Sequence, residues 1–268
     1  MIKKGDKGSN VIHLQQQLVK AGYPVMVDGW FGSETEQALL DFQRDYMITA
    51  TGKVGARTLT ALTGKILGNQ LTVHDMQYGA ELLAVPLATM ATVAHVESVG
   101  EGFTESMHPV VLFERHIFYK QLITYIDKNE VDRLTNHFPD LINPKRGGYA
   151  GGEKEWDRLS RAMAIHQSAA IESASWGMFQ IMGFHWPALG YTSSHDWFDA
   201  MCHNEVKHLT ALCRFIKQDP VMHGALQQQR WEEFAKRYNG PAYKDNNYDV
   251  KLAQAYAKFV NEYPDRQF

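Results

Sequence analysis

The clearest pattern of apolar and polar positions lies in residues 87–103, where an apolar helical repeat ends in a single carboxylate. At a period of roughly 3.6 residues, one face of this segment carries four positions in register: Met90, Val93, Ala94 and Glu97. Gly100 and Gly102 follow directly and are typical of a helix end. The pattern therefore predicts an apolar helix whose last turn contains Glu97.

A carboxyl group in the last turn of an apolar helix is disfavoured as an anion by desolvation and by the partial negative charge of the helix C-terminus. Both effects raise its pKa, and a carboxyl group that keeps its proton near neutral pH can act as a general acid. Glu97 is therefore a candidate catalytic acid. The alternative is a glutamate at the edge of the core that reaches water or pairs with a base such as Arg115.

The first 64 residues contain an internal repeat, in which residues 28–39 align with residues 51–62. The matched positions are two glycines, a threonine, an alanine and a leucine: Gly29/Gly52, Gly32/Gly55, Thr35/Thr58, Ala38/Ala61 and Leu39/Leu62. Each copy predicts a glycine turn that enters a helix. Residues 11–18 predict a further helix, which Gly22 and Pro24 end. We expect three short helices on a small core.

The remainder of the chain predicts a second, larger domain. A short linker with glycines, residues 65–72, separates it from the first domain, residues 1–64. Thr72 followed by Asp75 predicts a capped helix start. The expected fold class is mainly α, with a small three-helix domain followed by a larger, mostly helical α+β domain, residues 73–268, that contains a short β element.

Within the larger domain, four segments predict local structure. Residues 110–113 are the best strand candidate and end in polar residues. Residues 116–138 and residues 249–263 predict helices, and the glycine-rich residues 146–152 predict a flexible loop that forms the wall of a cleft. Cys202 and Cys213 fall in one predicted helix, too far apart for a disulfide, and are expected to be free thiols.

Composition changes this picture little. With a net charge of -3, 44% hydrophobic residues and 21% charged residues, the chain is typical of a globular protein and not of a nucleic-acid-binding domain. The first residues contain no apolar segment of a signal peptide, and no run of about 18 apolar residues follows, so we expect neither export by a signal sequence nor stable membrane insertion.

A metal enzyme is the main alternative from the composition, since the chain has 12 histidines. A zinc amidase or peptidase would contain a motif such as H-E-x-x-H, which does not occur, and His203 and His208 have the wrong spacing for two ligands on one helix face. We interpret most histidines as surface or core residues and expect no metal and no cofactor.

Two further segments carry candidate chemistry. Residues 172–183 combine small residues that permit close backbone approach with Trp176, which suits a sugar face, and Gln180, which both donates and accepts hydrogen bonds. Tyr238 and Asn239 begin a polar turn before the last predicted helix. These residues, with Glu97, are the candidates for a carbohydrate cleft.

The N-terminal pattern resembles the common three-helix peptidoglycan-binding domain. The matching positions cover nearly all of residues 3–63: Gly8, Val11, Leu14, Gln15, Leu18, Gly22, Tyr23, Asp28, Gly29, Phe31, Gly32, Thr35, Ala38, Phe42, Gln43, Gly52, Val54, Gly55, Thr58 and Leu62. The resemblance implies a cell-wall binding module whose binding surface lies around the glycine turns. The expected contributors are Asp28, Trp30, Phe31 and Tyr46, although Phe31 and Tyr46 also suit a core.

The second domain resembles the lysozyme and lytic-transglycosylase superfamily, and its sequence is more similar still to the N-acetylmuramidase domain of bacteriophage endolysins. The resemblance rests on five segments in order: VESVGEGF, PVVLFERHIFY, RGGY, SASWGMFQIMGFHW and YNGPAY. It implies a lysozyme-like fold and makes Glu97 the catalytic acid. It also places Ser175, Gln180 and Tyr238 in the glycan cleft. The other candidate substrate-binding residues are Ser98, Trp176 and Asn239.

The second catalytic group stays open at this point. Glycosidases usually pair the acid with another carboxylate, and Glu114, Glu101 and Glu172 all compete for this role. We favour Glu114 because it follows the predicted strand, although Arg115 and His116 beside it also fit a structural ion-pair cluster. A sole catalytic glutamate is also compatible with the sequence, with water or the 6-hydroxyl of the substrate completing the reaction.

Together these features predict a peptidoglycan hydrolase that cleaves the β-1,4 bond between N-acetylmuramic acid and N-acetylglucosamine during host cell lysis. The alternatives are a lytic transglycosylase that leaves 1,6-anhydro ends and a non-catalytic wall-binding protein. We expect a monomer that is made in the host cytoplasm, binds peptidoglycan strands and reaches the wall only after a holin-type protein permeabilises the membrane.

Overall fold

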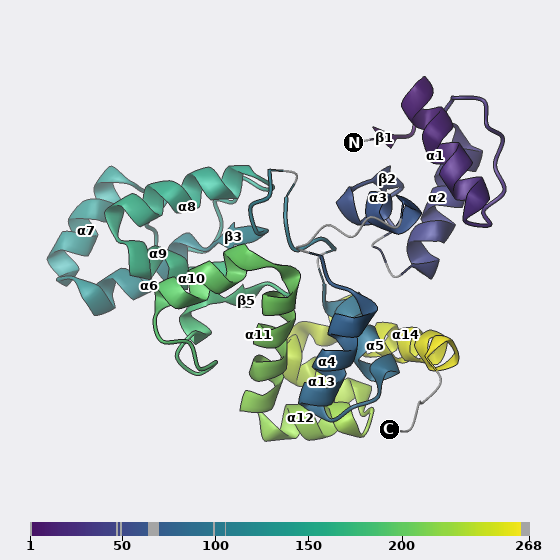
Figure 1. Cartoon of the computed structure of the whole chain (residues 1–268). Coiled ribbons are helices and arrows are strands. Elements are labelled where there is room, and N and C mark those ends of the chain that lie inside the picture. The colour runs from purple at the N-terminus through teal and green to yellow at the C-terminus, as the bar shows by residue number, and fades with distance from the viewer. Residues whose placement is uncertain are drawn as a thin grey trace. The chain divides into compact units, whose positions relative to one another are not determined.

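The computed structural model describes residues 2–46, 48, 50–63, 70–98, 100–104 and 106–263. The chain divides into two compact units, Met1–Gln70 and Leu71–Phe268, which are described separately below (Figure 1). Most of the predicted linker, residues 65–69, lies outside the described residues.

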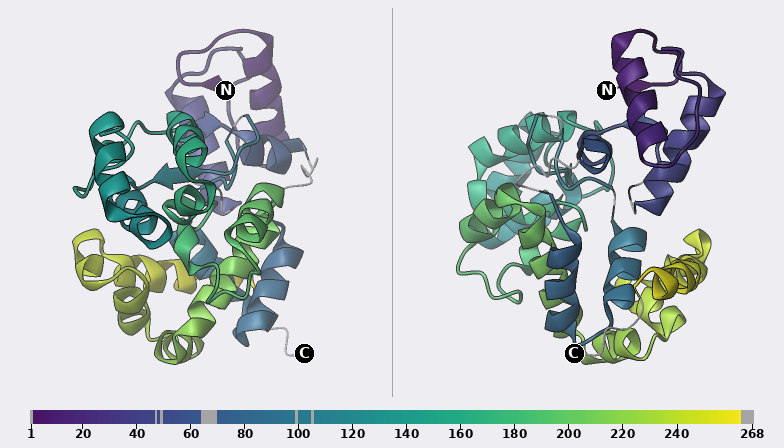
Figure 2. Two further views of the ribbon diagram at one scale, coloured as in Figure 1. Left: turned by 90° about the vertical axis from the view of Figure 1, so that its left-hand side faces the viewer. Right: turned by 45° about the vertical axis from the view of Figure 1, so that its right-hand side comes forward.

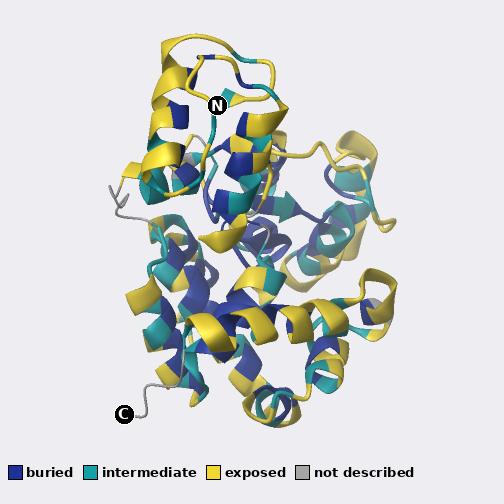
Figure 3. Cartoon of the chain, turned by 90° about the vertical axis from the view of Figure 1, so that its right-hand side faces the viewer, coloured by how far each residue is buried: buried dark blue, intermediate teal, exposed yellow. Residues whose placement is uncertain are grey.

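The N-terminal unit contains three helices and a two-stranded antiparallel ribbon: β1 (Ile2–Lys3), α1 (Ser9–Lys20), α2 (Ser33–Asp45), β2 (Lys53–Val54) and α3 (Ala56–Thr63). Its helices turn one face inward and the other to solvent (Figure 3). The inward faces form a core of aliphatic and aromatic side chains: Val11, Leu14, Leu18, Phe31, Ala38, Leu39, Phe42, Ile48 and Val54. The prediction of three short helices on a small core is confirmed.

The first copy of the repeat is built around a buried glutamine. Gln15, on α1, accepts a hydrogen bond from the backbone N–H of Gly29 at 2.9 Å. Its side-chain nitrogen donates to the Thr35 hydroxyl at 3.0 Å and to the Asp28 carboxylate at 2.9 Å. Because a buried amide without partners would cost about 1–3 kcal/mol, these contacts fix the turn against α1.

The second copy repeats this arrangement with Gln43 on α2. Gln43 accepts from the N–H of Gly52 at 3.0 Å and donates to the Thr58 hydroxyl at 3.0 Å and the Lys53 carbonyl at 2.7 Å. The glycine and threonine that recur at a fixed offset are therefore the partners of a glutamine on the preceding helix. The repeat in the sequence is a repeat of one hydrogen-bonded turn.

The C-terminal unit is mainly helical with one small sheet. Its elements in chain order are α4 (Val73–Leu83), α5 (Leu87–Glu97), β3 (Val111–Phe113), α6 (Arg115–Tyr125), α7 (Lys128–His137), α8 (Lys154–Ile165), α9 (Gln167–Glu172), β4 (Ala174–Trp176), β5 (Ile181–Met182), η1 (Gly183–His185), α10 (Ser194–His203), α11 (Glu205–Gln218), α12 (Pro220–Gln227), α13 (Trp231–Tyr238), η2 (Pro241–Asn246) and α14 (Tyr248–Glu262).

These elements form two groups around α5 and around the sheet. Helix α5 packs against α4 and α14, and α13 packs against α12 and α14 (Figures 1 and 2). Strands β3, β4 and β5 form an antiparallel sheet in that order, with Leu112 opposite Ser175 and Ser175 opposite Met182. Helices α6 and α8 pack against α9 beside this sheet.

Local sequence signals explain where α4 begins and where α5 begins and ends. Thr72 caps α4 because its hydroxyl accepts from the N–H of Asp75, whose carboxylate in turn accepts from the N–H of Thr72. Helix α5 follows Pro86 and is buried from residue 88 to residue 94. It ends at Glu97, where Ser98 turns to extended backbone. The predicted capped start and the predicted apolar helix are confirmed.

Two predicted continuous helices are each two helices in the structure. The segment 116–138 breaks at Ile126 and Asp127, and Asp127 caps α7 by accepting from the N–H of Asn129. The segment with the cysteines breaks at Asn204, which caps α11, so that Cys202 lies on α10 and Cys213 on α11. Both cysteines are free thiols. In both segments a capping side chain in mid-pattern started a new helix.

No single helix in the described ranges is long and apolar enough to cross a membrane. Helices α4 and α5 reach that length and hydropathy only as a pair, which is bent by 107°.

Candidate active site

Glu97 is held between the ends of two helices. It is the last residue of α5, and its side chain is half-buried. The side-chain amide of Asn239, the residue after α13, donates a hydrogen bond to its carboxyl oxygen at 3.1 Å. Two segments separated by 142 positions in the chain therefore meet at this carboxyl group. Arg115, the alternative partner, donates instead to the backbone carbonyls of Lys145 and Arg146.

Burial controls the protonation of Glu97. It raises the pKa of this carboxyl group from 4.5 to about 7, while the hydrogen bond from Asn239 and the charge of Lys251 act in the opposite direction. The desolvation effect wins because one amide donor compensates only part of the hydration that the carboxylate loses. Glu97 therefore exchanges its proton near neutral pH, as a general acid must.

Tyr238 positions the turn that carries Asn239. Its ring stacks on Phe234 at 5.6 Å between centroids and meets the edge of Phe215 at 5.9 Å. Burial and the nearby charge of Glu97 raise the pKa of the Tyr238 hydroxyl well above its ordinary value, so this hydroxyl keeps its proton. The aromatic packing fixes the end of α13 and thereby the amide of Asn239.

Ser175 and Gln180 come together at the turn between β4 and β5. The Ser175 hydroxyl donates to the side-chain oxygen of Gln180 at 2.8 Å, and the Gln180 amide donates to the carbonyls of Gly177 at 2.9 Å and Val110 at 3.3 Å. Gly177 has φ +70°, a conformation that favours glycine. Ser175 is buried and Gln180 is half-buried. Both side chains therefore stabilise the turn that presents them, and their contact with substrate stays a prediction.

His208, on α11, is a positioning residue that the sequence did not reveal. It is 1% exposed, accepts from the N–H of Met178 on Nδ1 at 3.2 Å, and so donates from Nε2 to the carbonyl of Met201 at 2.8 Å. A Cβ atom on Gly177 or on Gly102 would lie 2.6 Å from its Nδ1. The imidazole thus fixes both the Gly177 turn and the loop after α5.

Glu205, one turn before His208, supports the same loop. It is 2% exposed, and its carboxylate accepts from the N–H of Gly102 at 2.7 Å and of Leu71 at 2.8 Å. The pair appears in the sequence only as two polar residues at i and i+3 within an otherwise apolar face of α11. That pattern indicates buried polar contacts but not their partners.

Glu114 directly follows β3, and several hydrogen-bond donors lie around its carboxylate. It is 6% exposed, and its two oxygens lie 3.0 and 2.9 Å from the Tyr149 hydroxyl. Arg146 lies 3.5 Å from one oxygen, and His116 Nδ1 lies 3.1 Å from the other without hydrogen-bond geometry. These contacts join β3 to the predicted glycine-rich loop. Catalysis by Glu114 stays a prediction. Of the two residues in the alternative ion-pair cluster, His116 lies beside Glu114, whereas Arg115 donates to backbone carbonyls and Arg146 takes its place.

The other competing carboxylates lie in different surroundings. Glu172 is 5% exposed and accepts from the Tyr125 hydroxyl at 2.7 Å and from the Trp186 indole at 2.8 Å, so it joins α6, α9 and the segment after η1. Glu101 is half-buried in the loop after α5. Within the described ranges, no group of three or more His, Cys, Asp or Glu side chains is placed to hold a metal ion.

Burial contradicts a surface role for two predicted binding residues. Trp176 is 1% exposed, and its indole N–H donates to the carbonyl of Ile171 at 2.9 Å, so its ring cannot lie against a sugar. Phe31 is fully buried in the core of the N-terminal unit. In both cases the side chain completes a hydrophobic core, which removes more apolar surface from water than a surface position would.

The remaining residues predicted for wall binding lie on the surface. Trp30 is 54% exposed beside the Gly29 turn, and Tyr46 is 49% exposed and stacks on Phe42 at 4.3 Å between ring centroids. Asp28 is exposed, but its carboxylate accepts from the N–H of Trp30 and from Gln15, which lowers its pKa. Trp30 and Tyr46 are therefore the aromatic side chains of the predicted set that face solvent.

The chain combines a half-buried carboxyl group at a helix end with a separate three-helix module that carries exposed aromatic side chains. Residues 86–260 match the model of N-acetylmuramidase, and residues 7–62 match the model of the peptidoglycan binding domain. The chain belongs to the N-acetylmuramidase family and is a glycoside hydrolase with an N-terminal peptidoglycan-binding domain.

One solved structure similar to this chain is the crystal structure of Burkholderia AP3 phage endolysin. It is 42% identical in sequence with a TM-score of 0.76, and the match covers 97% of this chain and 99% of that one. The likeness therefore extends over both units and supports the mainly α, modular fold that the sequence predicted.

Proposed function

We propose that the enzyme cleaves the β-1,4 bond between N-acetylmuramic acid and N-acetylglucosamine, with Glu97 as the general acid. The observation that carries this proposal is the half-buried carboxyl group at the end of α5, whose pKa burial raises to about 7 and to which the Asn239 amide donates a hydrogen bond. Glu97 donates its proton to the oxygen that joins the two sugars. The bond from this oxygen to the muramic acid C1 breaks, and N-acetylglucosamine leaves as an alcohol.

The reaction ends when an oxygen nucleophile reaches C1. The carboxylate that Glu97 has become takes the proton of that nucleophile, which restores the acid for the next cycle. Water gives a reducing muramic acid end, and the 6-hydroxyl of the same sugar gives a 1,6-anhydro end. We propose water, and we propose a structural role for Glu114 because Tyr149, Arg146 and His116 already surround it.

The N-terminal domain keeps the enzyme on an insoluble polymer. A weak wall-binding module raises the local concentration of cleavable bonds around the catalytic unit, as linked binding sites generally do. We propose that Trp30 and Tyr46 contact the wall, because they are the exposed aromatic side chains of the predicted set. Replacing both with alanine should reduce binding to purified walls and leave cleavage of soluble glycan fragments unchanged.

We also propose that the enzyme acts as an endolysin. The support is its likeness to Burkholderia AP3 phage endolysin over 97% of this chain. In that role it is made as a monomer in the host cytoplasm and reaches the wall after a holin-type protein opens the membrane. Expression in bacteria should cause lysis only when the membrane is permeabilised. Lysis of cells with intact membranes would contradict this part of the proposal.

Digestion of purified peptidoglycan tests the chemistry. Wild type, Glu97→Gln and the control Glu81→Gln, which changes an exposed glutamate on α4, are compared, and the released ends are identified by mass spectrometry. We expect reducing muramic acid ends from wild type and control and almost none from Glu97→Gln. Anhydro ends would indicate a lytic transglycosylase, and full activity of Glu97→Gln would refute Glu97 as the acid.

A further inference from the structure

A pocket of about 360 Å³ lies between the last turn of α5, the helix that ends at Glu97, and one face of α14. His95 and Val96, the two residues before Glu97, line it from α5. Successive helix side chains point about 100° apart, so these two residues face away from the direction of Glu97. The pocket therefore flanks the catalytic carboxyl group and is not the place where Glu97 itself points.

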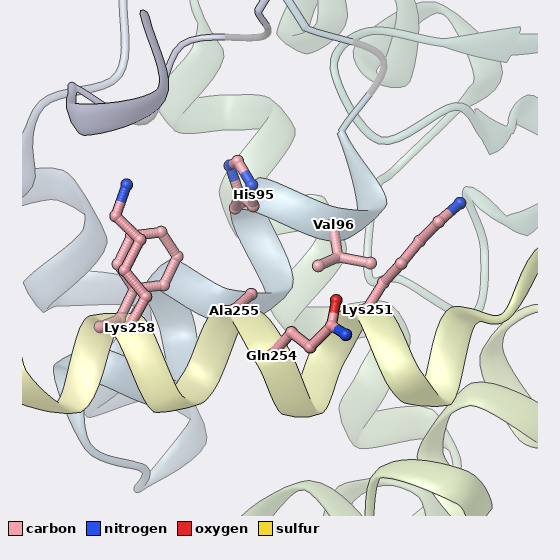
Figure 4. A pocket seen from close by; sticks show the side chains of 7 residues that line it. His95, Val96, Lys251, Gln254, Ala255 and Lys258 are labelled. Carbon is pink, nitrogen blue, oxygen red and sulfur yellow. The ribbon is translucent and has the colours of Figure 1, made fainter. Parts of the chain in front are cut away.

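The rim of the pocket is cationic. Lys251 and Lys258 project from α14 at its two ends, with Gln254 between them (Figure 4). All three side chains are exposed, and Lys251 forms no ion pair with a carboxylate in the part of the chain that the structure describes. None of the residues that line the pocket carries a negative charge. Such a site attracts anions and holds them by charge and by the Gln254 amide.

The floor of the pocket is apolar. Ala255 and Phe259 are buried on α14, and Val96 closes the floor from α5. His95 meets the edge of Phe259 at 5.5 Å, and burial together with the charge of Lys258 lowers the pKa of its imidazole. This lowering favours the neutral imidazole, which can still offer a hydrogen bond to a ligand. The floor accommodates methyl or short alkyl groups between two charged ends.

The spacing of the charges selects for an extended ligand. Lys251 and Lys258 are seven residues apart on one helix, which corresponds to about 10 Å along its axis. An extended peptide covers that distance in about three residues. Two carboxylates three residues apart, with small apolar side chains between them, would match the rim and the floor together.

We propose that this pocket binds the acidic peptide stem that muramic acid carries. The inference rests on the proposed function, since it requires the muramic acid to lie at Glu97. The stem is attached to the sugar whose bond is cleaved, so it leaves the glycan within one sugar of the catalytic acid and can reach a neighbouring pocket. Its carboxylates and small alkyl groups complement the lysines and the apolar floor, whereas a bare glycan offers neither.

The contributions of the two lysines can be tested separately, because each lysine acts on a different titratable group. The charge of Lys251 lowers the pKa of Glu97, so its removal also alters the acid. Lys258 instead acts on His95. Lys258→Met therefore tests the pocket with less effect on the catalytic proton, and the double variant tests the full rim. Lys120→Met, which changes an exposed lysine on α6, is the matched control.

The test compares two substrates from one wall preparation: glycan strands with their peptide stems and strands from which an amidase has removed them. We expect kcat/KM on stem-bearing strands to fall about threefold for Lys258→Met and about tenfold for the double variant. On stem-free strands, the kcat/KM of both variants should equal that of Lys120→Met when each enzyme is measured at its own pH optimum. Equal loss on both substrates, or no loss on either, would overturn the pocket assignment.

Direct binding supplies the second measurement. The free stem peptide released by the amidase is titrated into Glu97→Gln protein with labelled Lys251 and Lys258 side chains, and a polyglutamate peptide of equal charge serves as the comparison. We expect shifts at both lysines with the stem peptide and weaker binding of polyglutamate. Equal binding of both peptides would mean unspecific charge attraction and would refute the proposal. Retained activity of Glu97→Gln would instead refute the proposed function, whatever the lysine variants show.

Discussion

Glu97 and Glu114 are both carboxylates at the end of an apolar element, yet the structure surrounds them differently. Glu114 follows β3 and is 6% exposed, with Tyr149, Arg146 and His116 around its two oxygens. Glu97 ends α5, is half-buried and receives one amide hydrogen bond. The more deeply buried group has more donors, and the less buried group has fewer.

This difference teaches that burial alone does not mark a catalytic acid. A buried carboxylate whose oxygens contact several donors of neighbouring segments joins those segments and serves the fold. A carboxyl group that loses hydration without gaining equivalent donors keeps its proton to higher pH, as Glu97 does with a pKa of about 7. In the part of the chain that the structure describes, Glu97 has fewer donors than Glu114, and we propose that this difference suits it to act as the acid.

The largest expected effect is a difference in activity between variants of the two carboxylates. Glu97→Gln should reduce kcat on peptidoglycan by about 10²- to 10⁴-fold, because it removes the proton donor. Glu114→Gln should retain activity within about tenfold, since glutamine still accepts from Tyr149. Turbidity loss of purified walls measures both. If Glu114→Gln lost as much activity as Glu97→Gln while remaining folded, Glu114 would be the second catalytic carboxylate.

The next largest effect concerns His208, which contacts the Gly177 turn and the Gly102 loop. His208→Leu should lower kcat about tenfold to a hundredfold, because the Gly177 turn loses the acceptor of the Met178 N–H and the Gly102 loop loses the imidazole against which it packs. His208→Asn keeps an acceptor near the Met178 N–H and should restore part of this loss. Kinetics at temperatures well below the Tm of each variant separate misplacement from unfolding. Equal activity of both variants and wild type would contradict the positioning role.

A smaller effect is expected from the amide that contacts Glu97. The hydrogen bond from Asn239 lowers the pKa of Glu97, so Asn239→Leu should raise it further. The alkaline limb of kcat/KM, where the acid loses its proton, should then move to higher pH by about half a unit to one unit. Asn239→Gln is the conservative control. A shift towards lower pH would contradict the account of why this pKa is raised.

The smallest effect is on stability. The folded-state pKa of Glu97, about 7, lies above its ordinary value of 4.5, so the folded state binds this proton more tightly than the unfolded state. As pH rises through this window, wild type should lose on the order of 1–3 kcal/mol relative to Glu97→Gln. Denaturant unfolding across the window measures the difference. Glu114→Gln should instead be less stable than wild type throughout, because it weakens paired contacts.

Features that depend on neighbouring residues in the chain could be predicted from the sequence. The end of α5 follows from its apolar spacing and the glycines after it, and the start of α4 follows from Thr72 and Asp75. The three helices of the N-terminal unit follow from the same kind of signal. The repeat was visible as matched glycines and threonines, but its cause was not, because Gln15 and Gln43 lie outside the aligned segments.

Features that depend on distant partners could not be predicted in the same way. Trp176 has an aromatic ring that suits stacking on a sugar. Its pairing with β3 and its hydrogen bond to the carbonyl of Ile171 instead place the ring in the core. His208 looks like one histidine among twelve until the fold brings Gly102 and Met178 to its ring. The role of Glu114 likewise depends on Tyr149, which the chain places 35 residues later.

The most direct test of the central claim is an NMR titration of the Glu97 side-chain carboxyl carbon in protein labelled at glutamate. Comparison with the spectrum of Glu97→Gln assigns the signal. The account predicts a midpoint of about 7, well above the ordinary glutamate value of 4.5. A midpoint near the ordinary value of 4.5 would show that burial does not retain the proton and would contradict Glu97 as the general acid.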